Sequence, residues 1–105
     1  MMHAFEPKAP TVAVSATTTS ATAGGGSTVW RDSRQLQIAN LGPDTVFVAW
    51  GVVTRLPSGT LTATTTDYPV LPGATVVVTK GLADIAAVRT ATTTATVYFT
   101  PGVGL

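Results

Sequence analysis

Few side chains in this 105-residue chain could do chemistry, and their number and spacing do not favour catalysis. Histidine occurs once, as His3 in the predicted N-terminal arm, so neither a Ser-His-Asp triad nor a histidine-rich metal site is expected. The absence of cysteine excludes disulfides, thiolate metal sites and a cysteine nucleophile. We therefore expect a protein that is not an enzyme and has no metal or cofactor.

The five acidic residues all stand beside residues typical of turns: Glu6, Asp32, Asp44, Asp67 and Asp84. In turns, aspartate carboxylates accept hydrogen bonds from nearby backbone N–H groups. No two of these acids have a spacing that suggests calcium ligands or a glycosidase pair. Turn capping is therefore the predicted role of most of the aspartates.

Four aromatic residues, Trp30, Trp50, Tyr68 and Tyr98, could form a platform for a sugar or for stacked bases. Few polar residues accompany them, and aromatic side chains are common in protein cores and protein interfaces. Core or interface positions are therefore favoured, with Tyr68 and Tyr98 as the predicted interface pair.

Charge is scarce, because 10% of the residues are charged and 45% are hydrophobic, whereas a soluble domain has about 25% charged residues. The net charge of +1 is small and the six basic residues are scattered, so we expect no nucleic-acid partner. No apolar run approaches the ~20 residues of a membrane-spanning helix. Glu6, Pro7, Lys8 and Pro10 also interrupt any signal-peptide pattern, so neither a membrane location nor secretion by the general pathway is expected.

Threonine makes up about a fifth of the chain, and its branched Cβ favours strands over helices. No segment shows a convincing helical stripe. Alternating or wholly apolar segments predict strands at 11–15, 34–39, 45–53, 60–66, 74–80, 85–90 and 94–100. The segment 45–53 is apolar on both faces, which predicts that it is covered on both sides. Segments 34–53 and 85–100 are predicted to form hairpins, and 67–73 a bend.

These strands predict an all-β fold, a single antiparallel β-sandwich over residues 11–105, with jelly-roll topology the best fit. Residues 1–10 are expected to form an extended, irregular N-terminal arm because of Pro7 and Pro10. Residues 17–26 are expected to be a flexible loop. The glycines at 24–26 lack the lysine and helix of a phosphate-binding loop, so they are predicted to act as a linker.

Three segments resemble a family of small proteins encoded among the head genes of tailed bacteriophages: QIANLGPDTVFVAWG, TTTDYPVLPGATVVVT and ADIAAVRTATTTATVYFTPGVGL. The resemblance covers roughly residues 34–105, and the closing TVYFTPGVGL is its most specific part. Residues 1–33 show no matching pattern.

The resemblance implies a cement or decoration protein on the surface of a virion whose shell is built from an HK97-like major capsid protein, without nucleic acid or membrane as partner. A symmetric homo-oligomer is expected. Contacts with the shell or with other partners are expected at a set of arm and aromatic residues: His3, Phe5, Pro7, Lys8, Pro10, Tyr68 and Tyr98. The alternative is a carbohydrate-binding or adhesion module on the capsid surface or a tail fibre, with Trp30, Tyr68 or Tyr98 as the platform.

Overall fold

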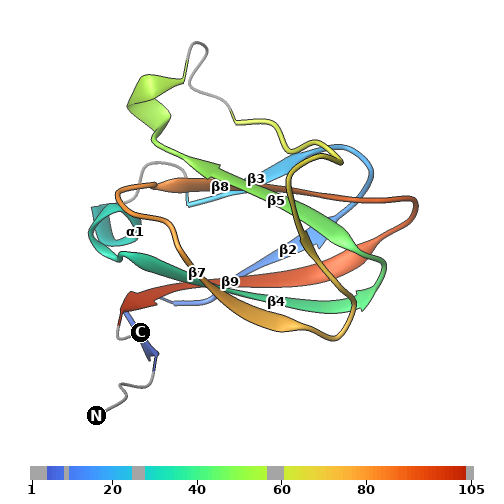
Figure 1. Ribbon diagram of the computed structural model, residues 1–105, viewed down its shortest axis with the longest axis horizontal. Helices are drawn as coiled ribbons and strands as arrows, with labels where there is room; N and C mark the ends of the chain where they lie inside the picture. Colours follow the sequence, from blue (N-terminus) through green and yellow to red (C-terminus); the bar gives the residue numbers. More distant parts are fainter. Residues whose placement is uncertain (1–4, 9, 25–27, 57–60, 104–105) are drawn as a thin grey trace.

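The valine- and threonine-rich segments of the chain form two antiparallel sheets that pack face to face (Figure 1). The computed structural model describes residues 5–8, 10–24, 28–56 and 61–103. The first sheet contains β1 (Glu6–Pro7), β2 (Val12–Ala16), β4 (Gln35–Pro43), β7 (Thr75–Thr79) and β9 (Ala95–Val103). The second contains β3 (Ala21–Ala23), β5 (Val46–Gly51), β6 (Tyr68–Val70) and β8 (Ile85–Thr90). The predicted all-β sandwich is confirmed.

The strands pair in a nested order. In the first sheet β9 pairs with β1, β2 and β4, and β4 pairs in turn with β7; in the second sheet the order is β3-β8-β5-β6. Among these pairs, β2 pairs with β9, β3 with β8, β4 with β7, and β5 with β6. Early strands thus pair with late strands, and the pairs lie one inside the other along the sequence. Every one of these pairs is antiparallel, as predicted.

Both predicted hairpins are wrong. Strands β4 and β5, in the segment 34–53, belong to different sheets, and so do β8 and β9 in the segment 85–100. The turn residues do reverse the chain as expected, with Gly42 at a φ of 84°. In each case the turn takes the chain from one sheet to the other. A short turn can connect two sheets as well as two neighbouring strands of one sheet.

Two loop and strand predictions are also corrected. The expected loop at 17–26 contains β3, since Ala21–Ala23 pair with β8. The threonine segment predicted as a strand at 60–66 forms no strand in its described residues 61–66, and β6 lies instead in the predicted bend at 67–73. In both cases the deciding partner is distant in sequence, so local propensity was overridden.

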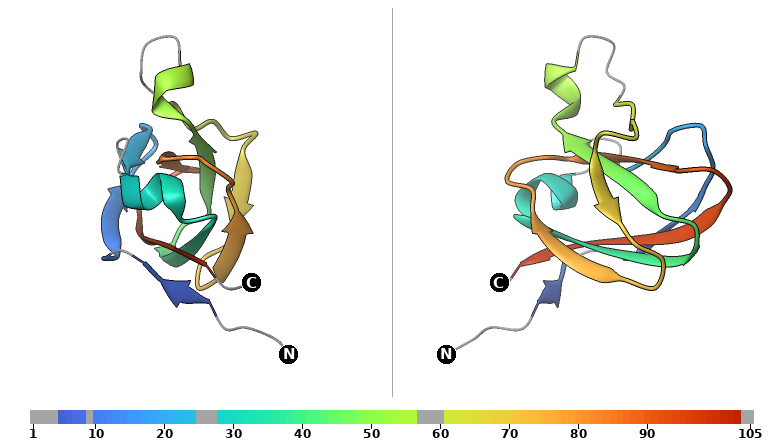
Figure 2. Two further views of the ribbon diagram at one scale, coloured as in Figure 1. Left: turned by 90° about the vertical axis from the view of Figure 1, so that its left-hand side faces the viewer. Right: turned by 45° about the vertical axis from the view of Figure 1, so that its right-hand side comes forward.

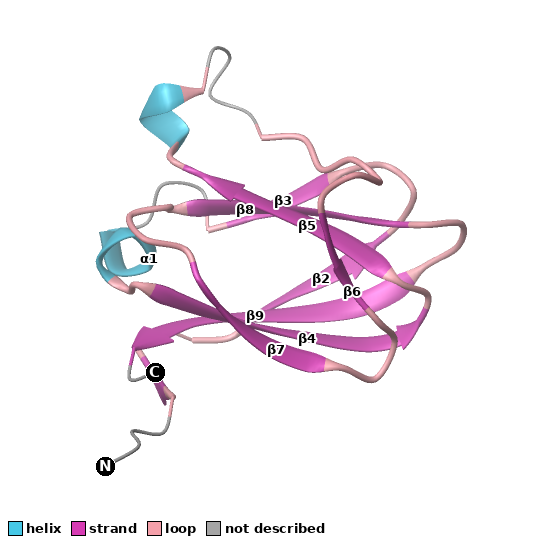
Figure 3. Cartoon of the chain, in the orientation of Figure 1, coloured by secondary structure: helices cyan, strands magenta, loops and turns pink. Residues whose placement is uncertain are grey.

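Inward-facing side chains of both sheets fill the core, with Leu36, Ile38 and Phe99 from the first sheet and Val46 and Val88 from the second. One end of the sandwich is closed by the short helix α1 (Thr28–Asp32), which the sequence did not predict (Figure 3). Its Trp30 is 3% exposed and lies against Phe99, with ring centroids 6.4 Å apart. Trp30 is therefore a core residue.

The predicted cover over the outer face of β5 is present along part of the strand. After the 3-10 turn η1 (Val53–Arg55), the described segment 61–67 runs from the side of β3, where the Ala63 N–H donates to Ser20 Oγ at 2.8 Å, to β6. Leu56 and Leu61 lie 3.9 Å from the position that a Cβ on Gly51 would take. Ala63 is buried, and so is Ala87 of β8. The second sheet thus has much of its outer face covered by the chain itself.

Asn40, at the corner between β4 and β5, connects three segments. Its side-chain Nδ2 donates to Asp44 O at 2.8 Å and to Val70 O at 2.9 Å, and its Oδ1 accepts from the Gly42 N–H at 2.8 Å. The side chain is fully buried. All of its hydrogen-bonding groups have partners, so it holds the corner and β6 together.

Candidate functional site

The residues expected to make contacts lie in three separate places. Phe5, Pro7, Lys8 and Pro10 belong to the N-terminal arm, and His3 lies outside the described residues. Tyr98 is half-buried on the outer face of the first sheet, whereas Tyr68 is 43% exposed at the start of β6 in the second sheet. The two tyrosines therefore do not form one interface pair.

The described arm residues are more regular than expected. Glu6 and Pro7 pair with Val103 and Gly102 at the end of β9, and the Lys8 N–H donates to Pro101 O at 2.9 Å. Figure 2 shows β1 beside the end of β9, projecting from the body of the sandwich. Proline fixes an extended φ here, and β9 supplies the hydrogen-bonding edge.

Gly102 is the position on which the arm rests. A Cβ there would collide with the ring of Phe5 and the carbonyl oxygen of Glu6. At the surface, Lys8 Nζ lies 2.8 Å from Glu6 Oε1. The hydrogen bond and charge of Lys8 lower the pKa of Glu6. The contact between arm and sheet is therefore small, with Gly102 buried beneath Phe5 and the ion pair at the surface.

The outer face that β2, β4, β7 and β9 form in the first sheet has no charge, and the acidic residue of this sheet, Glu6, lies in β1. The sequences of β2, β4, β7 and β9 contain no acidic or basic residue. Alternation along these strands places small or uncharged side chains on the outer face: Ala13, Ser15, Gln37, Ala39, Thr75, Val77, Thr96 and Tyr98. Unlike the second sheet, this face has no described segment crossing it, except where Phe5 lies on Gly102.

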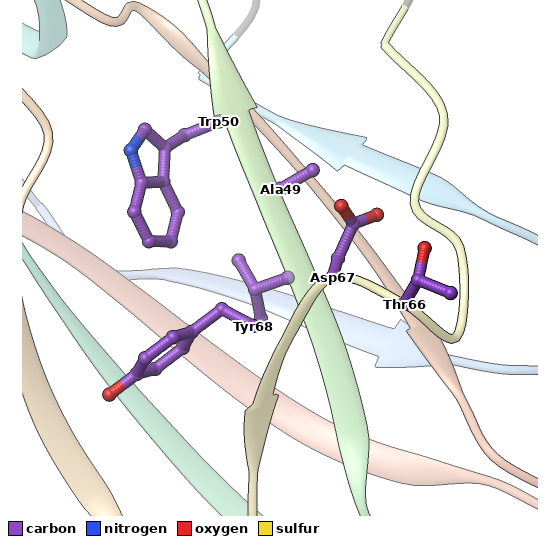
Figure 4. Close-up of a pocket in the computed structure, with 6 residues that line it drawn as sticks. Ala49, Trp50, Thr66, Asp67 and Tyr68 are labelled. Carbon is purple, nitrogen blue, oxygen red and sulfur yellow. The ribbon is translucent and has the colours of Figure 1, made fainter.

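A shallow pocket of about 480 Å³ lies at the edge of the second sheet, lined by Val48, Ala49, Trp50, Thr66, Asp67 and Tyr68 (Figure 4). The rings of Trp50 and Tyr68 meet edge-on, with centroids 5.9 Å apart and planes at 62°. The sequence had singled out both aromatics but not their proximity to Asp67. Asp67 and Tyr68 are neighbours in sequence, and this was the one feature of the sequence that could have indicated that Asp67 lies near the aromatic pair. Of the three residues considered as a carbohydrate platform, Trp30 is buried in the core, whereas Tyr68 and Tyr98 lie on different sheets.

Three aspartates accept backbone N–H groups, as predicted, but two of them do so over long distances in sequence. Asp67 Oδ2 accepts from the Thr64 N–H at 2.7 Å, which is a local turn. Asp84 Oδ1 accepts from the Val53 N–H at 2.9 Å. Asp44 Oδ2 accepts from the N–H groups of Thr92 and Thr93, and these bonds lower the pKa of Asp44. The carboxylates of Asp44 and Asp84 thus connect segments of the sandwich that are distant in sequence.

Lys80 is a buried cation, and no local pattern in the sequence predicts its burial. Its side chain is 6% exposed, and Nζ donates to the carbonyl oxygens of Trp30 and, at 2.6 Å, Ala83. Burial lowers its pKa from 10.5 to about 8, although Asp84 opposes the shift. Lys80 therefore fastens the end of α1 to the loop between β7 and β8.

The burial of Lys80 predicts that the free energy of unfolding increases at alkaline pH. The unfolded chain holds the Lys80 proton up to about pH 10.5 and the folded protein only to about pH 8, so the free energy of unfolding rises between these values. Urea titrations from pH 7 to 11 should show an increase of up to about 3 kcal/mol. The Lys80→Met variant should lack it, and parallel pH curves for the two proteins would contradict the assignment.

Two other kinds of feature are absent from the described residues. Among the described residues there is no group of three or more His, Cys, Asp or Glu that could hold a metal ion. No helix in the same residues is long and apolar enough to cross a membrane.

Comparison of the chain with protein-family models finds no match. Comparisons with curated proteins and with solved structures also give no significant match. The resemblance to bacteriophage head proteins is therefore a hypothesis that rests on the sequence segments themselves.

Proposed function

We propose that this protein is a capsid cement protein, which binds an assembled shell of HK97-like major capsid subunits through the outer face of its first sheet. The observation that carries the proposal is the uncharged outer face of β2, β4, β7 and β9, with Tyr98 upon it. A surface of this kind suits contact with a protein neighbour on the capsid surface.

The energetic argument concerns desolvation. Burying a charged side chain at an interface costs free energy unless the partner supplies an opposite charge, and interface cores are accordingly poor in charge and rich in tyrosine. The outer face of β2, β4, β7 and β9 has no charge to desolvate. Its small alanine, serine and threonine side chains also allow a neighbour to approach closely.

The strand order supports a jelly-roll topology for the sandwich. Eight strands, β2 to β9, pair first with last, second with seventh, third with sixth and fourth with fifth. This is the order obtained when one long antiparallel ribbon is rolled into two sheets. Jelly rolls are common in viral capsid proteins, which supports the proposed role, and they also occur in lectins.

The arm is the second proposed contact. Its described part is attached to the sandwich by two paired residues, one further backbone hydrogen bond and the contact of Phe5 with Gly102. Because this attachment is slight, the described arm residues can move toward a neighbouring subunit at small cost. We propose that several copies form a symmetric oligomer on the shell and add stability by binding the assembled form only.

The proposal predicts that the purified protein binds mature shells that lack it and raises their resistance to heat. Tyr98→Lys places a charge on the first sheet and should weaken shell binding by at least about tenfold, a cost of roughly 1.4 kcal/mol. Co-sedimentation with shells measures the binding of the unmodified protein and of Tyr98→Lys. Heating the shells with and without the protein measures their resistance to heat.

Leu71→Lys is the matched control, since Leu71 is 63% exposed in the turn between β6 and β7 and belongs to no strand of the first sheet. It should bind as the unmodified protein does. Failure of the unmodified protein to bind shells would overturn the cement role, whereas equal binding by Tyr98→Lys would exclude the first sheet as the contact.

A further inference from the structure

We propose that the edge of β5 beside the Trp50–Tyr68 pair accepts an extended peptide of another protein as an added strand. The site is the β5 notch, formed by the pocket residues Val48, Ala49, Trp50, Thr66, Asp67 and Tyr68. It lies in the second sheet, away from the outer face of the first, and it does not depend on the proposed capsid role.

The notch exists because β5 is longer than its neighbour. Strand β5 continues to Gly51 and pairs with β8 as far as Ile85, whereas its pairing with β6 ends at Val48 and Tyr68. In the described chain, residues Ala49–Gly51 of β5 thus have a strand partner on one side only. Such an edge is a template for another strand.

The backbone groups of Trp50 point into the notch. In an antiparallel strand the N–H and C=O groups of successive residues alternate between the two neighbours. Thr45 O accepts from the Ala91 N–H and Gly51 O from the Asp84 N–H, so the odd-numbered residues of β5 face β8. The backbone N–H and C=O groups of Trp50, like those of Val48, therefore point toward the β6 side of β5. At Trp50 they point into the space beyond the end of β6.

A capped turn keeps the chain itself from filling this place. Asp67 Oδ2 accepts from the Thr64 N–H at 2.7 Å, and the Asp67 N–H donates to Thr64 O at 3.1 Å. The turn brings the chain to β6 from the outer face of the sheet, so that Thr66 does not pair with Trp50. The gap in the ladder is thus held open by defined hydrogen bonds.

The two sides of the notch differ in chemistry. Figure 4 shows the rings of Trp50 and Tyr68 on one side of β5, and Ala49, Thr66 and Asp67 on the other. Successive side chains of an added strand point to opposite faces of a sheet. One set would therefore meet the aromatic pair and the alternate set the Asp67 carboxylate.

The preferred partner follows from these two sides. It is an extended peptide in which apolar residues, facing Trp50 and Tyr68, alternate with basic residues, one of which faces Asp67. Among the described residues, no basic side chain forms an ion pair with Asp67; the ion pair that is present joins Glu6 and Lys8. Main-chain hydrogen bonds supply the attachment and the alternate side chains the selectivity, as in other cases of strand addition.

The test uses a heptapeptide in which leucine alternates with lysine, added to the ¹⁵N-labelled full-length protein. We expect amide shifts confined to Ala49–Gly51 and Thr66–Tyr68, and slower hydrogen exchange at the Trp50 amide. The same peptide N-methylated along one edge cannot donate to β5 and should not bind. Equal binding by the methylated peptide would overturn the proposal.

Charge is tested separately. Asp67→Asn keeps an oxygen that can accept from the Thr64 N–H and removes the charge, so it should weaken binding of the lysine peptide about two- to fivefold. A peptide with glutamate in place of lysine should bind more weakly than the lysine peptide. Equal affinity of the two peptides would overturn the charge preference, and absence of binding at millimolar peptide, or oligosaccharide binding in its place, would overturn strand addition.

Discussion

Asn40→Leu is expected to lower the free energy of unfolding by about 3–5 kcal/mol, the largest effect predicted for a single side chain in this protein. The substitution leaves Asp44 O, Val70 O and the Gly42 N–H without their side-chain partner at a fully buried position. An unsatisfied buried polar group costs about 1–3 kcal/mol. The bond to Val70 O is buried and the other two are part-buried, so Val70 O and the cavity chemistry at Asn40 account for most of the loss. Thermal unfolding followed by circular dichroism should show a fall in Tm of roughly 15–25 °C.

Gln37→Leu provides the control for this experiment. It makes the same kind of replacement in β4 at a half-buried position on the outer face of the first sheet, and should change stability by less than about 0.5 kcal/mol. Asn40→Asp keeps the acceptor for the Gly42 N–H but loses both donors, so it should also be strongly destabilised at neutral pH. A small effect of both Asn40 variants would show that the corner does not depend on this side chain.

Gly24→Ala is expected to destabilise the fold by about 2–4 kcal/mol, from two separate causes. Gly24 has a φ of 93°, which L-residues rarely adopt, and an added Cβ would lie 2.7 Å from Trp30 Cε3 and 2.8 Å from Asp84 O. The linker prediction for 24–26 is therefore wrong at Gly24, which packs on the core tryptophan; residues 25 and 26 lie outside the described residues.

Gly73→Ala separates the two causes. Gly73 also has a positive φ, of 81°, but no atom lies within 4 Å of its added Cβ. Its substitution should cost about 1 kcal/mol or slightly more, from backbone strain alone. Chemical denaturation of both variants gives the packing cost at Trp30 as the difference, and equal losses would contradict the predicted collision.

The position of these sensitive residues agrees with the proposed surfaces. Asn40, Gly24, Trp30 and Lys80 act inside the sandwich or at its ends, where they hold separate segments together. The uncharged outer face of the first sheet and the β5 notch take no part in those contacts. Variants at Tyr98 and Asp67 can therefore test binding in a folded protein.

Prediction from sequence failed mainly where the identity of a strand's partner mattered. The hairpin predictions for 34–53 and 85–100 each place a chain reversal between two strands, and the chain does reverse there, but the flanking strands lie in different sheets. Asp44 shows why the sequence could not decide: it joins these two corners by hydrogen bonds to Thr92 and Thr93, which lie nearly fifty positions away. Turn chemistry is local, whereas the choice between a hairpin and a corner depends on the whole sandwich.

The sequence by itself determined the class of the fold and the lack of charge on its strands. β-branched residues favour strands wherever they occur, and a residue without charge has none in any fold, so these properties needed no partner. Only the tertiary structure decided that the uncharged residues of four strands share one face, that Trp50, Tyr68 and Asp67 surround an unpaired strand edge, and that Tyr98 lies on the other sheet. Those outcomes depend on which distant strands pair, a choice made by cooperative packing of the two sheets.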